Sequence, residues 1–210
     1  MSKNKRNRTN RGKWLIGLAV CALIATISGN LYGAKNDPLQ PRIAEKILRF
    51  HILANSDSDV DQEVKIKVRD AVGQMLEPRL KDAQDLADTE RIVEENMDAI
   101  VATAENTLEE NGFSYGASAR LAKVDFPVKT YGDYTFPAGE YEALQVTLGE
   151  GEGHNWWCVL YPNMCFQGSV YEVVDEESDE ELREVLTPEE YADVFDSGLP
   201  WPAGLPSDSR

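Results

Sequence analysis

The histidines and cysteines of this sequence are the side chains best suited to nucleophilic, acid–base or metal chemistry. They are His51, His154, Cys21, Cys158 and Cys165. A metal site requires three or four converging ligands, and neither H-x-x-x-H nor C-x-x-C spacing is present. We therefore interpret both histidines as ordinary strand or turn residues. The alternative is that they lie on neighbouring strands and approach an acid such as Asp57.

Nucleophilic catalysis finds little support in the spacing of these residues. Cys158 and His154 are four residues apart, about 13 Å along a strand, so they cannot touch within it. The string GEGEG at 149–153 places acids where a phosphate would bind, and a strand rather than a helix follows it. We expect no catalytic residue, no bound metal and no cofactor.

Cys158 and Cys165 form a candidate disulfide. A hairpin turn centred between Tyr161 and Pro162 would place the two cysteines opposite each other, at a cross-strand distance that a disulfide can bridge. The alternative is a pair of buried thiols, because a short loop gains little from the bond. Strand alternation also predicts that Trp156 and Trp157 face opposite sides, one in the core and the other covered by the tail or exposed.

The first 34 residues differ in composition from the rest of the chain. Six basic residues and no acid precede an uncharged run from Trp14 to Tyr32. A cationic segment before an apolar stretch is typical of an export signal. The apolar core is shorter than the roughly 20 residues of a spanning helix, which favours a signal peptide. No A-x-A site stands nearby, so an anchor over 14–32 is the alternative.

The remaining sequence is strongly acidic. The formal net charge is -16, although the export segment contains six of the 21 basic residues. A protein that binds nucleic acid needs an excess of basic residues to neutralise the phosphates, so we exclude nucleic acid as a partner.

Hydrophobic periodicity predicts a strand and two helices in the first half of the domain. The alternation in LRFHILANS predicts a half-buried strand, with Arg49, His51 and Asn55 on its polar face. Valines four residues apart predict a helix from about residue 59, which Pro78 should end or kink. A second helix is expected over 88–110.

A period of two returns over 122–128, 144–148 and 157–161 and predicts three further strands. The order strand, helix, helix, strand, strand, strand indicates an α+β domain: an antiparallel or mixed sheet of about four strands, with two helices on one face. We assign this domain to residues 35–170. Residues 171–210 form an acidic, proline-containing tail, largely disordered or with a short docked helix from Pro188 to Phe195.

Four strings resemble the stage II sporulation protein R family: LRFHILANSDSDVDQEVKIKVRDAV (48–72), FPVKTYG (126–132), FPAGEYEAL (136–144) and GEGHNWWCVLYP (151–162). Members of that family are exported from the forespore into the space between the two membranes. There they trigger the mother-cell membrane protease SpoIIGA to process pro-sigma-E.

The resemblance implies a signalling ligand rather than an enzyme. Candidate protease contacts are polar or aromatic groups that core packing does not demand: Arg49, His51, Asn55, Asp57, His154, and whichever of Trp156 and Trp157 is exposed. The alternative is an extracytoplasmic hydrolase of cell wall or peptide, with a metal at His51 and His154.

Overall fold

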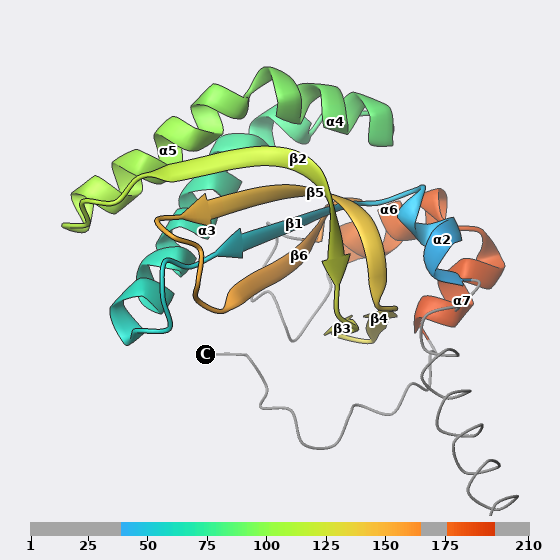
Figure 1. Ribbon diagram of the computed structural model, residues 1–210. Coiled ribbons are helices and arrows are strands. Elements are labelled where there is room, and N and C mark those ends of the chain that lie inside the picture. Colours follow the sequence, from blue (N-terminus) through green and yellow to red (C-terminus); the bar gives the residue numbers. More distant parts are fainter. Residues whose placement is uncertain (1–38, 165–175, 196–210) are drawn as a thin grey trace, which may run out of the picture. The chain divides into compact units, whose positions relative to one another are not determined.

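In the computed structural model, which describes residues 39–164 and 176–195, four strands form one mixed sheet in the order β2-β5-β1-β6 (Figure 1). β1 runs parallel to β5, whereas the β1–β6 and β2–β5 pairs are antiparallel. The strands are β1 (Leu48–Leu53), β2 (Ala117–Phe126), β5 (Gly139–Leu148) and β6 (Asn155–Tyr161). A separate hairpin consists of β3 (Lys129–Tyr131) and β4 (Tyr134–Phe136). The α+β fold class is confirmed.

Helices α3 (Asp59–Leu80), α4 (Leu86–Glu95) and α5 (Met97–Glu110) cover one face of the sheet (Figure 1). Val64, Val68 and Val72 of α3 form the expected row and pack on β1 and β5, whereas Val60 in the first turn is exposed. The buried residues of this core include Val64, Val68, Val72, Leu76, Phe50, Ile52, Leu144 and Val146. Their burial supplies the main stabilisation of this layer, at roughly 25 cal/mol for each Å² of apolar surface removed from water.

The first turn of α3 has the polar groups that helix initiation requires. Ser58 is the N-cap, and its hydroxyl accepts a hydrogen bond from the backbone N–H of Asp61. Asp59 and Asp61 lie in the first turn, where a negative charge suits the helix dipole. Pro78 does not end α3, which continues to Leu80. The backbone N–H that Pro78 lacks therefore falls within the last turn of α3.

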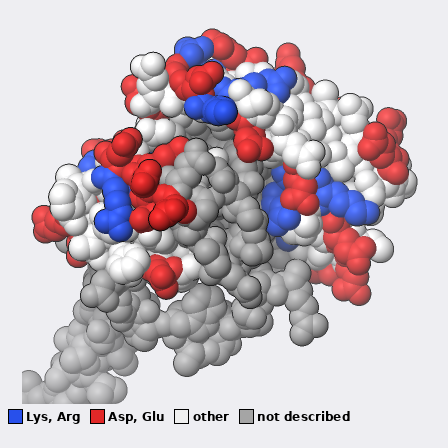
Figure 2. Space-filling model, turned by 180° about the vertical axis from the view of Figure 1, so that it is seen from behind, with Lys and Arg blue, Asp and Glu red and all other residues white. Residues whose placement is uncertain are grey.

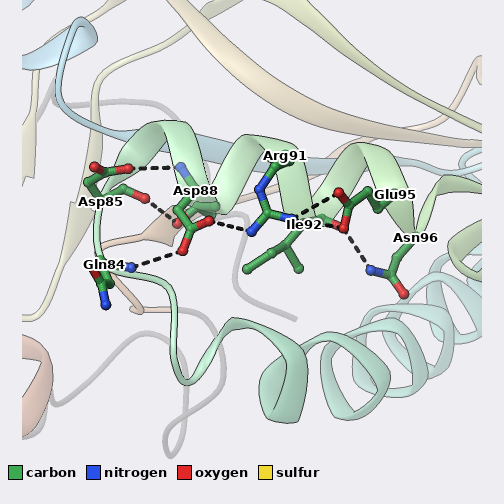
Figure 3. A network of polar contacts seen from close by, with 8 residues as sticks. Gln84, Asp85, Asp88, Arg91, Ile92, Glu95 and Asn96 are labelled. Carbon is green, nitrogen blue, oxygen red and sulfur yellow. Dashed lines mark hydrogen bonds and ion pairs between the residues drawn. The ribbon is translucent and has the colours of Figure 1, made fainter.

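The single helix expected over 88–110 is wrong, because two helices occupy this range. The break is Asn96, whose φ of -106° and ψ of 11° leave the helical region. Its side-chain amide donates to the carbonyl of Ile92 and so closes the end of α4 (Figure 3). At the other end of α4, Asp85 caps the backbone N–H of Asp88. Short-range hydrogen bonds from Asn and Asp compete with helix continuation here.

The opposite face of the sheet is covered at one end by α2 (Leu39–Ala44), α6 (Glu176–Val185), α7 (Pro188–Phe195) and the β3–β4 hairpin. The expected helical layer on one face is thus present as α3, α4 and α5, and further helices cover the other face. Buried residues that form this second core include Ile43, Phe136, Tyr141, Val159, Leu182 and Val194.

The described part of the acidic tail is thus two docked helices. α7 has the expected bounds, and its capping box is formed: the N–H of Thr187 donates to Glu190, and the N–H of Glu190 donates to Thr187. Glu190 is buried and paired with Lys46 at 2.6 Å. That contact ties α7 to the segment before β1.

β1 was expected to be half-buried, but it is flanked by β5 and β6 and covered on both faces, so five of its six residues are buried. The stretch 149–153 connects β5 to β6, which are not neighbours, because β1 lies between them. The connection therefore passes across the end of β1.

The export segment expected over 1–34 lies outside the described residues. Among those that are described, no helix is both long and apolar enough to cross a membrane.

Candidate functional site

Two loops lock together at the end of the sheet where β1 finishes and β6 begins. The first loop is 54–58 and the second is 149–154; together we call them the loop junction. The backbone N–H groups of Glu152 and Gly153 donate to the carbonyls of Asn55 and Ala54, at 3.2 and 2.9 Å. The Asn55 side chain accepts from the N–H of Glu150 at 3.0 Å. These bonds satisfy backbone groups that a loop over a strand end would otherwise leave unpaired.

Glycine is required at two positions of the loop junction. Gly149 has a φ of +55°, and a Cβ there would lie 2.1 Å from Oδ1 of Asn55. At Gly153, a Cβ would lie 2.2 Å from the backbone carbonyl oxygen of Ser56. Backbone cannot move aside as a flexible side chain can, so the closest approach of the two loops depends on Gly153.

Asp61 is the buried carboxylate beneath the loop junction. It accepts hydrogen bonds from Ser56 at 2.5 Å, Asn55 at 3.0 Å and Tyr115 at 2.6 Å. Burial opposes ionisation, but these hydrogen bonds and one from Ser58 outweigh it and lower the pKa of Asp61 to about 2. The same contact and burial raise the pKa of the Tyr115 phenol. The Asp61 carboxylate is therefore charged. Its hydrogen bonds connect α3 to loop 54–58 and to the segment before β2.

Asp57 and His154 form a hydrogen-bonded pair at the surface of the loop junction. Oδ1 of Asp57 accepts from the backbone N–H of His154 at 2.7 Å and lies 2.5 Å from its Nδ1. The backbone hydrogen bond is the main cause of the lowered pKa of Asp57; the imidazole contributes too, and slight desolvation opposes both. The two side chains are 57% and 61% exposed. Nε2 of His154 is thus presented at the surface while Asp57 holds the ring.

Lys65 of α3 anchors the loop junction from below. Its Nζ donates to the carbonyl of His154 at 2.9 Å and to Oε1 of Gln62 at 2.6 Å. Gln62 in turn donates to the carbonyl of Ser56. One face of the first turns of α3 therefore holds both loops.

Arg49 is fully buried on the face of the sheet opposite α3. Its Nη2 donates to the Tyr131 hydroxyl at 3.1 Å, while Nε and Nη1 have no partner among the described residues. The guanidinium lies 4.4 to 5.8 Å from four ring centroids, those of Phe126, Tyr141, Phe136 and Tyr131. Cation–π contact replaces the carboxylate that a buried cation usually has.

His51 is two residues after Arg49 on β1, so its side chain lies on the same face of the sheet. Its ring stacks on Trp157 with 4.9 Å between centroids and 7° between planes, and Phe126 packs edge-on against it. Burial first, and then the charges of Arg120 and Arg49, lower the pKa of His51 to about 4. The imidazole is therefore neutral at physiological pH.

Trp156 faces the helices, as alternation predicts. It is 3% exposed, packs edge-on against Phe50 at 5.5 Å, and has the Arg69 guanidinium over its ring at 5.3 Å. Trp157, on the other face, is half-buried. Trp156 is therefore a core residue, and Trp157 is the member of the pair with surface left to contact a partner.

The structure separates the sequence-predicted site residues into three groups. Asn55, Asp57 and His154 meet in the loop junction; Arg49, His51 and Trp157 lie on the opposite sheet face; and Trp156 lies in the helical core. Arg49 and His51 were expected on a polar, accessible face, but β1 is the central strand and both are buried.

His51 lies on β1 and His154 directly precedes the neighbouring strand β6, yet only His154 meets Asp57. His51 is instead held between Trp157 and Phe126. Within 39–164 and 176–195, no group of three His, Cys, Asp or Glu residues could hold a metal ion. The arrangement proposed for the hydrolase alternative is therefore not formed by these residues.

Cys158 is buried and disulfide-bonded. Its expected partner, Cys165, lies outside the described residues. β6 ends at Tyr161, and the turn that follows is closed by a hydrogen bond from the N–H of Met164 to the carbonyl of Val159.

The roles of Asp61, Tyr115 and Lys65 were not predicted from the sequence. A Ser followed three residues later by an acid is typical of a helix start, and this local pattern does not show that the acid is also a buried acceptor. Tyr115 is 54 residues from Asp61, and no local pattern links them.

The described residues define a small α+β domain in which polar groups join two loops and present one oriented pair of hydrogen-bonded side chains, Asp57 and His154. Comparison with known proteins gives the family. Residues 44–171 match the family described as stage II sporulation protein R. The chain is 40% identical over 176 residues to stage II sporulation protein R of Bacillus subtilis (strain 168), covering 80% of this chain and 79% of that protein. This chain therefore belongs to the stage II sporulation protein R family. No solved structure matches it.

Proposed function

We propose that this protein is an exported sporulation signal, which crosses the forespore membrane and activates a SpoIIGA-type membrane protease of the mother cell, so that pro-sigma-E is processed. The observation that carries the proposal is the family match over 44–171, together with 40% identity to the Bacillus subtilis protein. The basic and apolar composition of residues 1–34 supports export, either with signal cleavage or with residues 14–32 kept as an anchor.

Activation by a ligand requires that the ligand bind the active form of the protease better than the inactive form. The loop junction is suited to such binding, because its hydrogen bonds fix the backbone while Asp57 and His154 remain exposed. A preorganised surface loses little conformational entropy on association. We therefore assign the protease contact to the loop junction, with Trp157 as a second contact.

The surface charge supports a protein partner rather than nucleic acid. Among the described residues on the face seen in Figure 2, Lys and Arg side chains lie beside Asp and Glu side chains and form no continuous basic area. Such an area is the usual electrostatic feature of a nucleic-acid-binding surface.

Co-expression in a non-sporulating bacterium tests the proposal. The full chain is produced with a matching SpoIIGA and pro-sigma-E, and mature sigma-E is followed by immunoblot. We expect processing with all three proteins, none without this chain, and none when residues 14–27 are deleted. Processing without this chain would refute the proposal, as would no processing when the exported chain accumulates normally.

A further inference from the structure

A cavity of about 380 Å³ lies where α3 ends, α4 begins, β6 ends and α6 passes by. This volume falls within the range of small ligand sites. The residues of the loop junction do not line it, and neither do Arg49, His51 or Trp157. The cavity therefore has no role in the contacts described above.

Part of the cavity wall is hydrocarbon. Pro78 and Leu80 come from the end of α3, Ala83 from the connection to α4, and Leu160 from β6. These four side chains offer no hydrogen-bonding atoms, so they suit an apolar stem rather than a fully polar ligand.

The polar side chains of the wall are Glu77, Lys81, Thr89, Tyr161, Asn163 and Glu181, and the two carboxylates among them only accept hydrogen bonds. Oδ1 of Asn163 is buried and has no hydrogen-bond partner among the described residues. Glu181 is fixed beside it, because its Oε2 accepts from the Asn163 N–H at 2.9 Å. Glu77 adds a second carboxylate. A buried acceptor without a donor is costly, and a ligand with N–H groups would satisfy it.

The electrostatic environment of the cavity is negative. The pKa of Tyr161 is raised, first by burial and then by the charges of Asp85, Glu181 and Glu184. Lys81 is the one cation among the described lining residues, and its side chain is exposed. The phenol ring of Tyr161 provides a π-face in the same wall, which favours a cation over a neutral group.

We propose that this cavity binds an arginine side chain of a partner protein. The alkyl stem would pack on the apolar wall, and the planar guanidinium would donate to Asn163 and Glu181 while it lies against Tyr161. Arginine fits better than lysine, because its donors point in several directions in one plane. This proposal does not rest on the proposed function, because arginine binding can be measured in the absence of the protease.

The test uses the full chain in detergent micelles and the peptide acetyl-Gly-Gly-Arg-Gly-Gly-amide, with affinity measured by NMR titration. The same peptide with citrulline, which has the shape of arginine without its charge, should bind at least tenfold more weakly. Glu181→Gln should weaken arginine-peptide binding about fivefold. Ala83→Phe, which fills the cavity and keeps its charge, should abolish binding.

The matched control is Glu95→Gln, which removes an exposed carboxylate at the far end of α4 (Figure 3). It should leave the affinity unchanged. Equal affinity for the citrulline peptide, or equal weakening by Glu95→Gln, would overturn the proposal, as would full binding to a folded Ala83→Phe protein. If Glu181→Gln lowers the melting temperature, Glu77→Gln provides the same comparison, and its failure to weaken binding would also overturn the proposal.

Discussion

Asp57 and His154 are 97 residues apart in sequence, yet one carboxylate oxygen of Asp57 binds both the backbone N–H and the imidazole of His154. Both side chains are more than half exposed, so the pair adds little to stability. What it determines is the orientation of a histidine on the surface of the loop junction.

Asp57→Ala should therefore separate function from stability. We expect the free energy of unfolding to stay close to that of the unchanged protein, because a contact between two exposed side chains contributes little. Processing of pro-sigma-E in the co-expression assay should fall at least about threefold, since contact residues dominate binding energy. Glu95→Ala, which removes another exposed, paired carboxylate, is the control. Normal processing by a stable Asp57→Ala protein would remove Asp57 from the contact surface.

Gly153→Ala should disrupt the loop junction. Its Cβ would meet the Ser56 carbonyl oxygen at 2.2 Å, so the two loops must separate. We expect a loss of about 2 kcal/mol or more in unfolding free energy, measured by urea denaturation. Gly116→Ala is the matched control, because there the nearest atom is a Glu105 side-chain oxygen at 3.1 Å. Equal stability of the two variants would show that loop 54–58 moves aside without cost.

Asp61 should make stability depend on pH in the acid range. Its pKa of about 2 lies below the 3.8 of an unperturbed carboxyl, so the stabilisation is complete above pH 3.8 and is lost as the pH falls towards 2. Asp61→Asn should cost about 2 kcal/mol at pH 7 and much less at pH 2. Urea denaturation of both proteins across this range provides the measurement. A difference that does not vary with pH would contradict the assignment.

His51 should make stability depend on pH in a higher range than Asp61 does. Its pKa of about 4 lies below the ordinary 6.5, so the unfolded chain takes up this proton first and stability falls as the pH decreases from 6.5 to 4. His51→Phe should keep the stack on Trp157 and remove up to about 3 kcal/mol of this acid sensitivity. NMR titration of the imidazole is the direct measurement. A pKa of 6.5 or above for His51 in the folded protein would refute the account.

Local sequence predicted several elements well, for a physical reason in each case. The valine row predicted α3, because the helix period involves residues only three or four apart. The same holds for α7, where Thr187 and Glu190 form their capping box. Asn96 was missed because its break depends on a side chain that folds back on Ile92, and Asn within a helix often makes no such bond.

The candidate site was predictable only as a set of residue types. Alternation correctly separated Trp156 from Trp157, but it could not show that β1 is central, and so it placed Arg49 and His51 on an accessible face. Which strands are neighbours depends on long-range packing, and no periodicity encodes that choice.

By itself, the sequence determined the α+β class, the acidic character, the export-like first segment and the strings typical of its family. The tertiary structure alone decided that β1 lies between β5 and β6, so that the connection 149–154 must cross the end of β1. That crossing brings His154 to Asp57 and requires Gly153, because contacts between residues about 100 positions apart arise only when the packed core fixes the order of the strands.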